Sequence, residues 1–305
     1  MQGREESPED VAKEIAGVTQ ILKSVADEAS GHVRIEITKA AEILSRLAAT
    51  LPPRYPPVPM PESCPAVDLL LGSDRIITQE LPISDFANVE VDCAFIFEIM
   101  PAPTCSVAIT TSENIFAYLD VARSGNTLRL TLKPARFEHR PVLEARIKMP
   151  ALRRLRQAAA ARGIVRGFNS EGPFDLYLSG ASTLHMDAAA GDVKMEVSGA
   201  SRTNGTLRAK SVDLTVSGAS RADLQGATAN LVLSAWGAAS IDLAGLVARQ
   251  ATVYLKSASR ATVNVSGQLD IDLSGASHLD YLGQPNLSEI NLTGASTLNQ
   301  MRSNG

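Results

Sequence analysis

The sequence predicts an all-β protein built as a parallel β-helix, with a helical segment in front of it. Three observations lead to this fold class. A motif of the Ser-Gly-Ala-Ser type recurs at near-constant spacing, apolar and polar residues alternate ahead of each motif, and the repeats contain no helical period. A fixed period near 20 residues indicates a solenoid, and alternation with a period of two indicates strands. Each repeat is therefore expected to form one coil of about 19 residues.

The composition narrows the class of protein further. The chain has 305 residues and a formal net charge of −4, so one or two domains are expected and no nucleic acid is expected as a partner. No apolar run approaches the roughly 20 residues that span a bilayer, so no transmembrane segment is expected. Three Cys and four His are too few and too scattered for a zinc framework, and we expect no metal and no cofactor.

Residues 1–51 are expected to be helical. Ser7 is suited to cap a helix that begins at Pro8, and apolar residues then follow at alternating steps of four and three. Ser30 and Gly31 interrupt this heptad pattern, which resumes with a shift of one residue. Two interpretations remain open: helices packed on the neighbouring domain, or a short coiled coil that forms a homo-oligomer.

Residues 52–66 are rich in proline and are expected to form an extended linker. A proline-rich ligand for a partner domain is the less favoured interpretation. The start of the chain lacks the basic and apolar regions of a secretory leader, so we expect either that the chain as written is cytoplasmic or that a leader is missing from it.

The β-helix domain is expected over residues 67–300, followed by a tail of residues 301–305. Residues 76–149 alternate in the manner of short strands separated by turn residues. Cys93 and Cys105 fall in one strand-turn-strand region, and the spacing leaves open whether they pair.

The repeat proper fills the rest of the chain. Its motifs end in serines that are expected to form a structural ladder bonded from coil to coil: Ser182, Ser201, Ser220, Ser240, Ser259, Ser277 and Ser296. The Gly and Ala of each motif permit a tight corner. Apolar residues two apart ahead of each motif, such as Val193, Met195 and Val197, are expected to face the interior. A bulge is expected around residues 234–236, and a degenerate earlier corner at 158–161.

These features resemble a bacterial family, the putative auto-transporter adhesins with a head GIN domain. The residues that carry the resemblance are the opening at 83–89, the segment at 125–130, the lead-in at 149–152 and the serial Ser-Gly-Ala-Ser coils. The resemblance covers about residues 70–300. It implies a right-handed parallel β-helix, a place at the cell surface or in the periplasm, and a role as an adhesin.

A polar stripe on the outer surface is the candidate binding site. The residue after each motif serine is expected to point outward, and so is the residue two positions further. The first set is Thr183, Arg202, Arg221, Ile241, Arg260, His278 and Thr297, and the second is His185, Asn204, Asp223, Leu243, Thr262, Asp280 and Asn299.

From these sets we take as candidate ligand-binding residues Arg202, Asn204, Arg221, Asp223, Arg260, His278 and Asp280. Arg binds carboxylate or sulfate in bidentate fashion, so the expected partner is a surface glycan or another polyanion. The alternative is a solvated face whose Arg and Asp side chains pair with each other.

Two other features give weaker support for function. Residues 133–166 are strongly basic, but they contain a single aromatic residue, Phe137, which is not typical of single-strand nucleic-acid binding. The Asp residues of the repeats are scattered, and no carboxylate pair suited to acid–base catalysis stands out. The sequence favours a non-enzymatic cell-envelope binding module. The alternatives are a self-assembling scaffold that uses the N-terminal helices and, less favoured, a polysaccharide-degrading enzyme.

Overall fold

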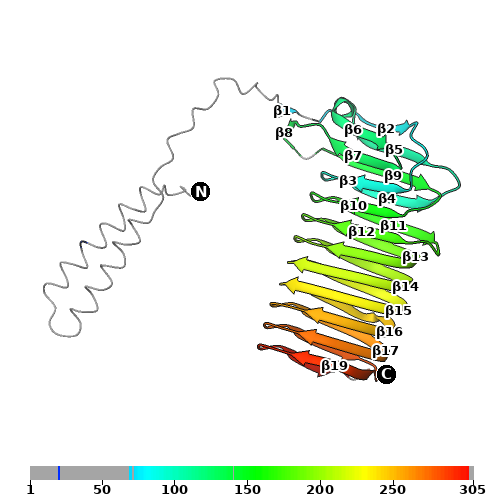
Figure 1. The fold of residues 1–305 in the computed structure, drawn as a ribbon. Helices are drawn as coiled ribbons and strands as arrows, with labels where there is room; N and C mark the ends of the chain where they lie inside the picture. The colour runs from blue at the N-terminus through cyan, green and yellow to red at the C-terminus, as the bar shows by residue number, and fades with distance from the viewer. Residues whose placement is uncertain (1–19, 21–68, 71, 140, 302–305) are drawn as a thin grey trace. The chain divides into compact units, whose positions relative to one another are not determined.

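The computed structural model describes Gln20 and residues 69–70, 72–139 and 141–301. Apart from Gln20, the predicted helical segment and linker lie outside the described residues, and so does most of the predicted tail. Residues 69–70, 72–139 and 141–301 fold as an all-β solenoid, which confirms the fold class predicted from the repeat (Figure 1). They belong to a compact unit that spans Val67–Gly305. The right-handed winding that the resemblance implies stays a prediction.

The elements of the solenoid are β1 (Leu69–Leu70), β2 (Ile76–Leu81), β3 (Asn88–Val91), β4 (Ile96–Pro101), β5 (Ser106–Ser112), the 3-10 helix η1 (Glu113–Tyr118), β6 (Leu119–Ser124), β7 (Thr127–Leu132), β8 (Arg136–Phe137), β9 (Leu143–Met149), β10 (Arg154–Gln157), β11 (Arg162–Asn169), β12 (Phe174–Leu178), β13 (Thr183–Val197), β14 (Arg202–Gly218), β15 (Arg221–Gly237), β16 (Ser240–Leu255), β17 (Arg260–Leu273), β18 (His278–Leu282), β19 (Asn286–Leu292) and β20 (Thr297–Gln300).

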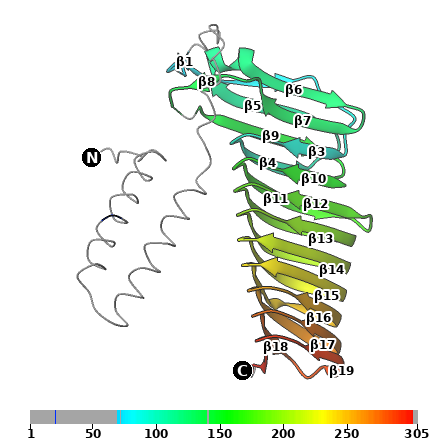
Figure 2. The same ribbon diagram turned by 60° about the vertical axis from the view of Figure 1, so that its left-hand side comes forward.

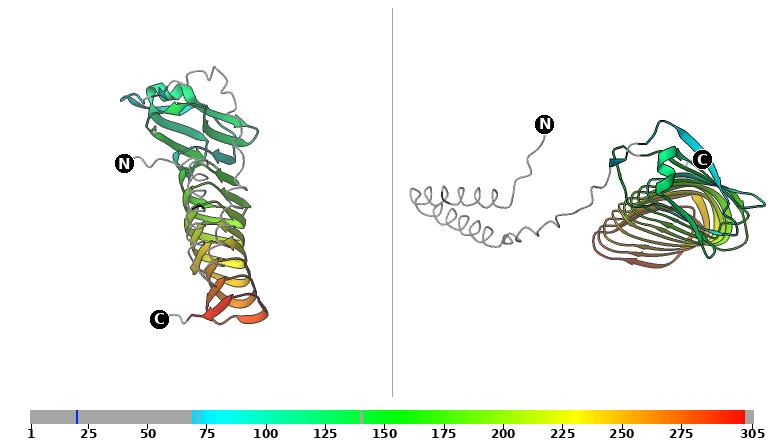
Figure 3. Two further views of the ribbon diagram at one scale, coloured as in Figure 1. Left: turned by 90° about the vertical axis from the view of Figure 1, so that its left-hand side faces the viewer. Right: turned by 90° about the horizontal axis from the view of Figure 1, so that it is seen from above.

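Parallel strands from successive coils form two faces. Face A contains β9, β4, β11, the N-terminal halves of β13 to β17, β18 and β20. Face B contains β7, β3, β10, β12, the C-terminal halves of β13 to β17, and β19. The long strands β13 to β17 run through both faces, so each coil pairs with its neighbours along most of its length (Figure 2). Seen from above, the coils overlie one another (Figure 3).

The first coils do not follow the order of the chain. Strand β3 lies between β7 and β10, and β4 lies between β9 and β11. The segment 88–101 is therefore inserted between two coils that come later in the sequence. Beyond it, β2 and β5 continue the sheet in antiparallel fashion from β9, and β6 does so from β7. These antiparallel strands close the N-terminal end of the stack, where bare strand edges would otherwise face solvent.

The interior is a continuous apolar core. Val193, Met195 and Val197 are buried as predicted, and so are the corresponding residues of the later coils, Val212, Leu214, Val216, Ala251, Val253, Leu255, Leu269, Ile271 and Leu273. Alternation with a period of two places them on the inner side of each strand, where every coil stacks on the next. Burial of this apolar surface, at about 25 cal/mol per Å², is the main favourable term for such a fold.

Each corner that leads from face B to face A is a tight turn whose second residue has positive φ. Glycine occupies this place in most coils, with φ of +74° at Gly180, +77° at Gly199 and +74° at Gly218. Ser257 adopts the same conformation, with φ of +64°, although it carries a Cβ. The degenerate corner expected at 158–161 is present, and its second residue, Ala159, has a φ of +52°.

Three corner serines, Ser182, Ser259 and Ser296, close their own turns, whereas the buried hydroxyls of Ser201 and Ser220 have no hydrogen-bond partner among the described residues. The Ser182 hydroxyl donates to the carbonyl oxygen of Ser179 at 2.7 Å, and the Ser259 hydroxyl donates to that of Lys256 at 2.9 Å. Side-chain bonds to the preceding coil are longer, as between the Ser277 hydroxyl and the Leu255 carbonyl oxygen at 3.5 Å. The short bonds between coils come from the backbone. The expected ladder of side-chain bonds is therefore mainly a backbone ladder.

One coil departs from the predicted register. Ser240 is exposed and pairs with Arg221, whereas the buried Ala239 takes the place of the ladder serine. The corner motif of this coil is therefore Trp-Gly-Ala-Ala at 236–239, one residue earlier than predicted. The bulge predicted around 234–236 lies instead in the next coil, where the pairing of β15 with β16 shifts between Asp223 and Gly226. Assignment of Ser240 to the ladder is thus wrong.

We expect Gly199→Ala to destabilise the solenoid by more than about 2 kcal/mol. A Cβ at this position would lie 2.5 Å from the carbonyl oxygen of Gly180 in the preceding coil, and the left-handed conformation alone costs an L-residue about 1–2 kcal/mol. Urea unfolding followed by circular dichroism measures the change. An unfolding midpoint equal to that of the unsubstituted protein would contradict the packing argument.

The matched control is Ser257→Gly at the same place of another corner, and it is expected to stabilise by about 0.5 kcal/mol. Release of the left-handed strain, about 1–2 kcal/mol, outweighs the extra entropy of glycine in the unfolded chain, about 0.4–1 kcal/mol. The same unfolding experiment should therefore show shifts of opposite sign for the two variants.

Candidate functional site

The predicted polar stripe forms two columns on the outer side of face A. The first column, in spatial order, is Arg162, Thr183, Arg202, Arg221, Ser240, Arg260, His278 and Thr297. The second column, two residues further along each strand, is Ile164, His185, Asn204, Asp223, Asp242, Thr262, Asp280 and Asn299. We call the two columns together the polar stripe. In-register stacking places neighbouring members one coil apart, about 4.8 Å.

Two residues assigned to the stripe from the sequence are not part of it. Ile241 and Leu243 are buried in the core, and Ser240 and Asp242 take their places on the outer side. The cause is the misplaced motif of this coil, because a shift of one residue exchanges the inner and outer sides of a strand. Sequence reasoning therefore missed Asp242. The register of the interior residues Leu231, Leu233 and Ala235 would have revealed it.

A groove of about 460 Å³ lies on the stripe around β14 and β15. Its lining includes Arg202 and Arg221 from the first column, Asn204 and Asp223 from the second, and Ser240 from the next coil. Four of the seven candidate ligand-binding residues thus lie in one depression. Arg260, His278 and Asp280 lie further along the same columns, outside this lining.

The guanidinium groups of Arg202, Arg221 and Arg260 are exposed, and they make no ion pair or hydrogen bond with any other residue that the structure describes. Arg202 and Arg221 are direct neighbours in the stack. Like charges opposite each other on adjacent strands destabilise a sheet. The mutual pairing of Arg and Asp that a merely solvated face would show is absent at these three positions.

Along the stack, a His–Asp cluster lies on either side of Arg202, Arg221 and Arg260. His278 contacts Asp280 at 3.0 Å through Nε2, and its Nδ1 contacts the hydroxyl of Thr297. Asn299 donates to Asp280 at 3.4 Å. His278 and Asp280 are therefore satisfied by their neighbours, which makes them less available to a ligand than the Arg side chains.

The second cluster holds Asp187 on the coil before the groove. The hydroxyl of Thr206 donates to its carboxylate at 2.6 Å, the Thr206 backbone N–H does so at 3.2 Å, and His185 lies at 3.3 Å. These hydrogen bonds, with that of the Thr206 hydroxyl foremost, lower the pKa of Asp187.

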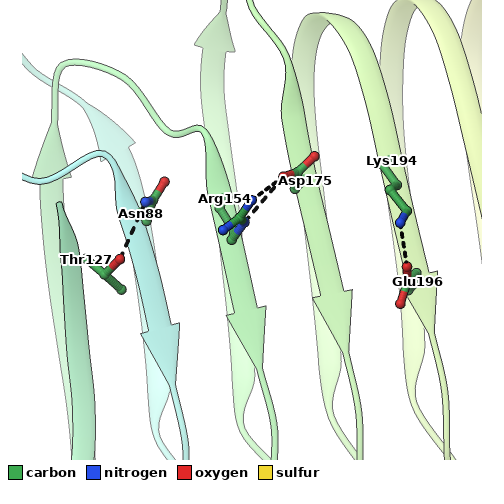
Figure 4. Close-up of polar contacts among 6 residues, drawn as sticks. All are labelled: Asn88, Thr127, Arg154, Asp175, Lys194 and Glu196. Atoms are coloured by element: carbon green, nitrogen blue, oxygen red, sulfur yellow. Dashed lines mark hydrogen bonds and ion pairs between the residues drawn. The ribbon is translucent and has the colours of Figure 1, made fainter. Parts of the chain in front are cut away.

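Face B is organised differently. In its N-terminal half, charges pair with each other: Arg154 with Asp175 at 2.8 Å and Lys194 with Glu196 at 2.9 Å (Figure 4). Asp175 raises the pKa of Arg154, and Glu196 raises that of Lys194. The basic run at 133–166 is thus partly neutralised by neighbouring acids. Arg166 lies 3.8 Å from Glu98 on face A, which fits the interpretation of this run as a solvated surface.

The remaining candidate chemistry is sparse. Within the described ranges, no three His, Cys, Asp or Glu residues come together in a way that would hold a metal ion. Cys93 and Cys105 are both free thiols; the first lies near Thr131 and the second near the carbonyl oxygen of Phe86. No helix in the described part of the chain is long and apolar enough to cross a membrane.

The fold and the stripe define a class of protein: a β-solenoid domain with a polar outer surface of stacked side chains. Residues 85–285 match the family described as putative auto-transporter adhesin, head GIN domain, and the chain belongs to this family. The resemblance seen in the sequence is thereby confirmed. The family description names an adhesin, specifies no ligand and indicates no enzyme.

Solved structures share the fold. A putative adhesin from Parabacteroides merdae ATCC 43184 is 16% identical, with a TM-score of 0.73 over 77% of this chain and 99% of its own. A putative lipid binding protein from Parabacteroides distasonis ATCC 8503 is 18% identical, with a TM-score of 0.71 over 77% and 100%. A putative adhesin from Bacteroides fragilis NCTC 9343 is 16% identical, with a TM-score of 0.60 over 76% and 100%. No curated protein matches the sequence.

We expect Thr206→Val to raise the pKa of Asp187 toward its ordinary value, because the strongest of its hydrogen bonds is lost. A carboxyl whose pKa is lowered by folding stabilises the protein above its unfolded-state pKa, and this contribution disappears as the pH falls through the folded-state value. Thr206→Val should therefore lower the free energy of unfolding at neutral pH through Asp187, and this loss should disappear at a pH below both the folded-state and the unfolded-state pKa of Asp187. Carboxyl carbon NMR across an acid titration measures the shift. Thr215→Val, on face B, is the control and should leave Asp187 unchanged.

Proposed function

We propose that this solenoid is a non-enzymatic binding module of the cell envelope, which holds an anionic glycan or another polyanion along the polar stripe. The observation that carries the proposal is that Arg202 and Arg221, which occupy directly opposite positions on adjacent strands, both line the groove and form no ion pair with any described residue. A chain that places like charges side by side loses stability, and this loss is offset when an anion binds between them.

The geometry suits a polymer better than a small anion. Arg260 lies two coils beyond Arg221, so the three guanidinium groups follow one column over about 14 Å at about 4.8 Å per coil. A polymer that carries carboxylate or sulfate groups at intervals contacts all three when it lies along the solenoid. Asn204 and Asp223 add a donor and acceptors for its hydroxyl groups in the same groove.

The absence of a catalytic constellation in the groove favours binding over turnover. Asp223 and Asp242 are its nearest carboxylates, on adjacent coils, and neither is hydrogen-bonded to a His or another carboxylate that would set its protonation. The groove offers recognition by charge and hydrogen bonds, which is what an adhesin needs. The family membership supports the same role.

We expect the triple variant Arg202→Ala/Arg221→Ala/Arg260→Ala to lose at least about tenfold in affinity for an anionic polysaccharide, since about 1.4 kcal/mol corresponds to tenfold. Binding to immobilised heparin, alginate and hyaluronate at low ionic strength measures the loss. The affinity of the unsubstituted protein should also fall as salt rises, because exposed charges are screened.

The matched control is Arg208→Ala/Lys210→Ala/Arg249→Ala. It also removes three positive charges, but at exposed positions that do not line the groove. It should bind nearly as well as the unsubstituted protein. Equal losses in the two triple variants would show attraction by net charge alone, and no loss in the first would refute the stripe as the site.

A further inference from the structure

A second surface on face B carries exposed apolar side chains that the polar stripe does not explain. Trp236, Tyr254 and Val232 expose 47%, 42% and 40% of their surface. They come from the C-terminal halves of β15 and β16. Ser234 pairs with Tyr254, and Val232 and Trp236 flank Ser234 two residues to either side. Tyr254 is therefore the diagonal neighbour of both, at the distance of about 7–8 Å that aromatic side chains can bridge.

Trp236 departs from the repeat, because the equivalent positions of the other corners carry no aromatic residue. It stands at the first place of the corner motif and pairs with Ser217 of the preceding coil. The other corners of the repeat have no aromatic residue at this place: Ala158, Ser179, Ser198, Ser217, Lys256, Ser274 and Thr293. Trp236 leaves 47% of its surface exposed beside two other exposed apolar side chains, and exposed apolar side chains that gather in one place indicate a binding surface.

The surroundings of these rings are polar and carry both signs of charge, since Lys256 lies beside Trp236 on the following coil and Lys194 lies opposite Asp213 on the adjacent strand. Asp213 lies beside Val232 on the preceding coil, and Asp272 lies beside Tyr254 on the following coil. Neither carboxylate has an ion pair or a side-chain hydrogen bond within the described part of the chain. In the N-terminal half of the same face the charges pair instead, as Arg154 does with Asp175 (Figure 4).

We propose that Trp236 and Tyr254 form a stacking platform for an uncharged oligosaccharide, distinct from the anion-binding stripe. A pyranose ring presents a face of C–H groups that packs on an aromatic ring, while its outward hydroxyl groups donate hydrogen bonds to carboxylates such as Asp213 and Asp272. The aromatic rings favour an uncharged ring face, whereas the Arg side chains of the stripe favour anionic groups, so the two surfaces differ in the ligand chemistry that they recognise.

A protein partner fits this surface less well. A stable protein interface takes about 800 Å² from each side, with some 20–30 residues. Here three apolar side chains have polar and charged neighbours. The hydroxyl groups among these neighbours belong to Thr215, Ser234 and Thr252. A patch of this size matches one or two sugar rings and provides an acceptor for hydroxyl groups on either side.

The single tryptophan makes the test direct. The full chain is titrated with neutral oligosaccharides (cello-, xylo-, manno-, malto- and chito-oligosaccharides of four to six units) while the Trp236 emission is recorded. A member of the panel that binds should produce a saturable change in intensity and a shift to shorter wavelength, both insensitive to salt. Calorimetry with the same sugar should show at least about tenfold weaker binding for Trp236→Ala and for Tyr254→Ala, whereas Tyr254→Phe should retain stacking.

Two controls separate this proposal from the anion-binding stripe. The triple Arg202→Ala/Arg221→Ala/Arg260→Ala variant should keep the neutral-sugar response. Ile96→Ala, which removes an exposed apolar side chain from face A, should keep the response as well. No saturable change with any neutral sugar overturns the proposal. Sugar binding that survives Trp236→Ala also overturns it. A third contrary result is a light-scattering mass that is lower for Trp236→Ala than for the unsubstituted protein, since that result assigns the patch to a protein interface.

Discussion

The structure depends on the in-register stacking of its corners. At each corner the backbone turns with positive φ and stacks on the corner of the preceding coil. A backbone N–H of the corner donates to a carbonyl oxygen of that preceding corner, as from Ala200 to Gly180 at 2.8 Å. The contact is so close that Gly199 has no space for a side chain. Because the corners must coincide, a coil with an additional residue accommodates it elsewhere. The register shift in β16, on face A, serves that purpose and leaves the next corner in place.

This constraint explains which parts of the fold the sequence predicts. Corner motifs and inward residues repeat in every coil, so their spacing alone predicts the coils and the core. Trp236 replaces the first serine of its motif, and Ser240 then imitates a motif serine one position too late. The motif pattern therefore predicts the wrong register in this coil. The inward-facing apolar residues predict the correct register, because packing against the neighbouring coils determines which residues face inward.

The arrangement of the first coils could not be predicted in the same way. The segment 88–101 carries strand patterns that fit any place in the stack, and its position between β7/β9 and β10/β11 is decided by pairing over long sequence distances. The polar stripe was predictable as a column, since Arg202 and Arg221 occupy equivalent places. Whether those side chains pair with acids depends on their rotamers and neighbours, and this information appears only in three dimensions.

A solenoid stabilised from within leaves its outer positions free to differ, and this chain uses that freedom unevenly. Where face B pairs Arg154 with Asp175, the surface is internally neutralised and offers little to a ligand. Where Arg202 and Arg221 are neighbours without an ion pair, or where Trp236 replaces a serine, the surface keeps exposed groups that no neighbouring side chain satisfies. The spacing of the coils repeats such groups at a fixed interval, so a polymer of the kind proposed above would contact several of them at once. Each additional contact would then add affinity without a further cost of ordering the protein, because the scaffold is ordered before a ligand binds.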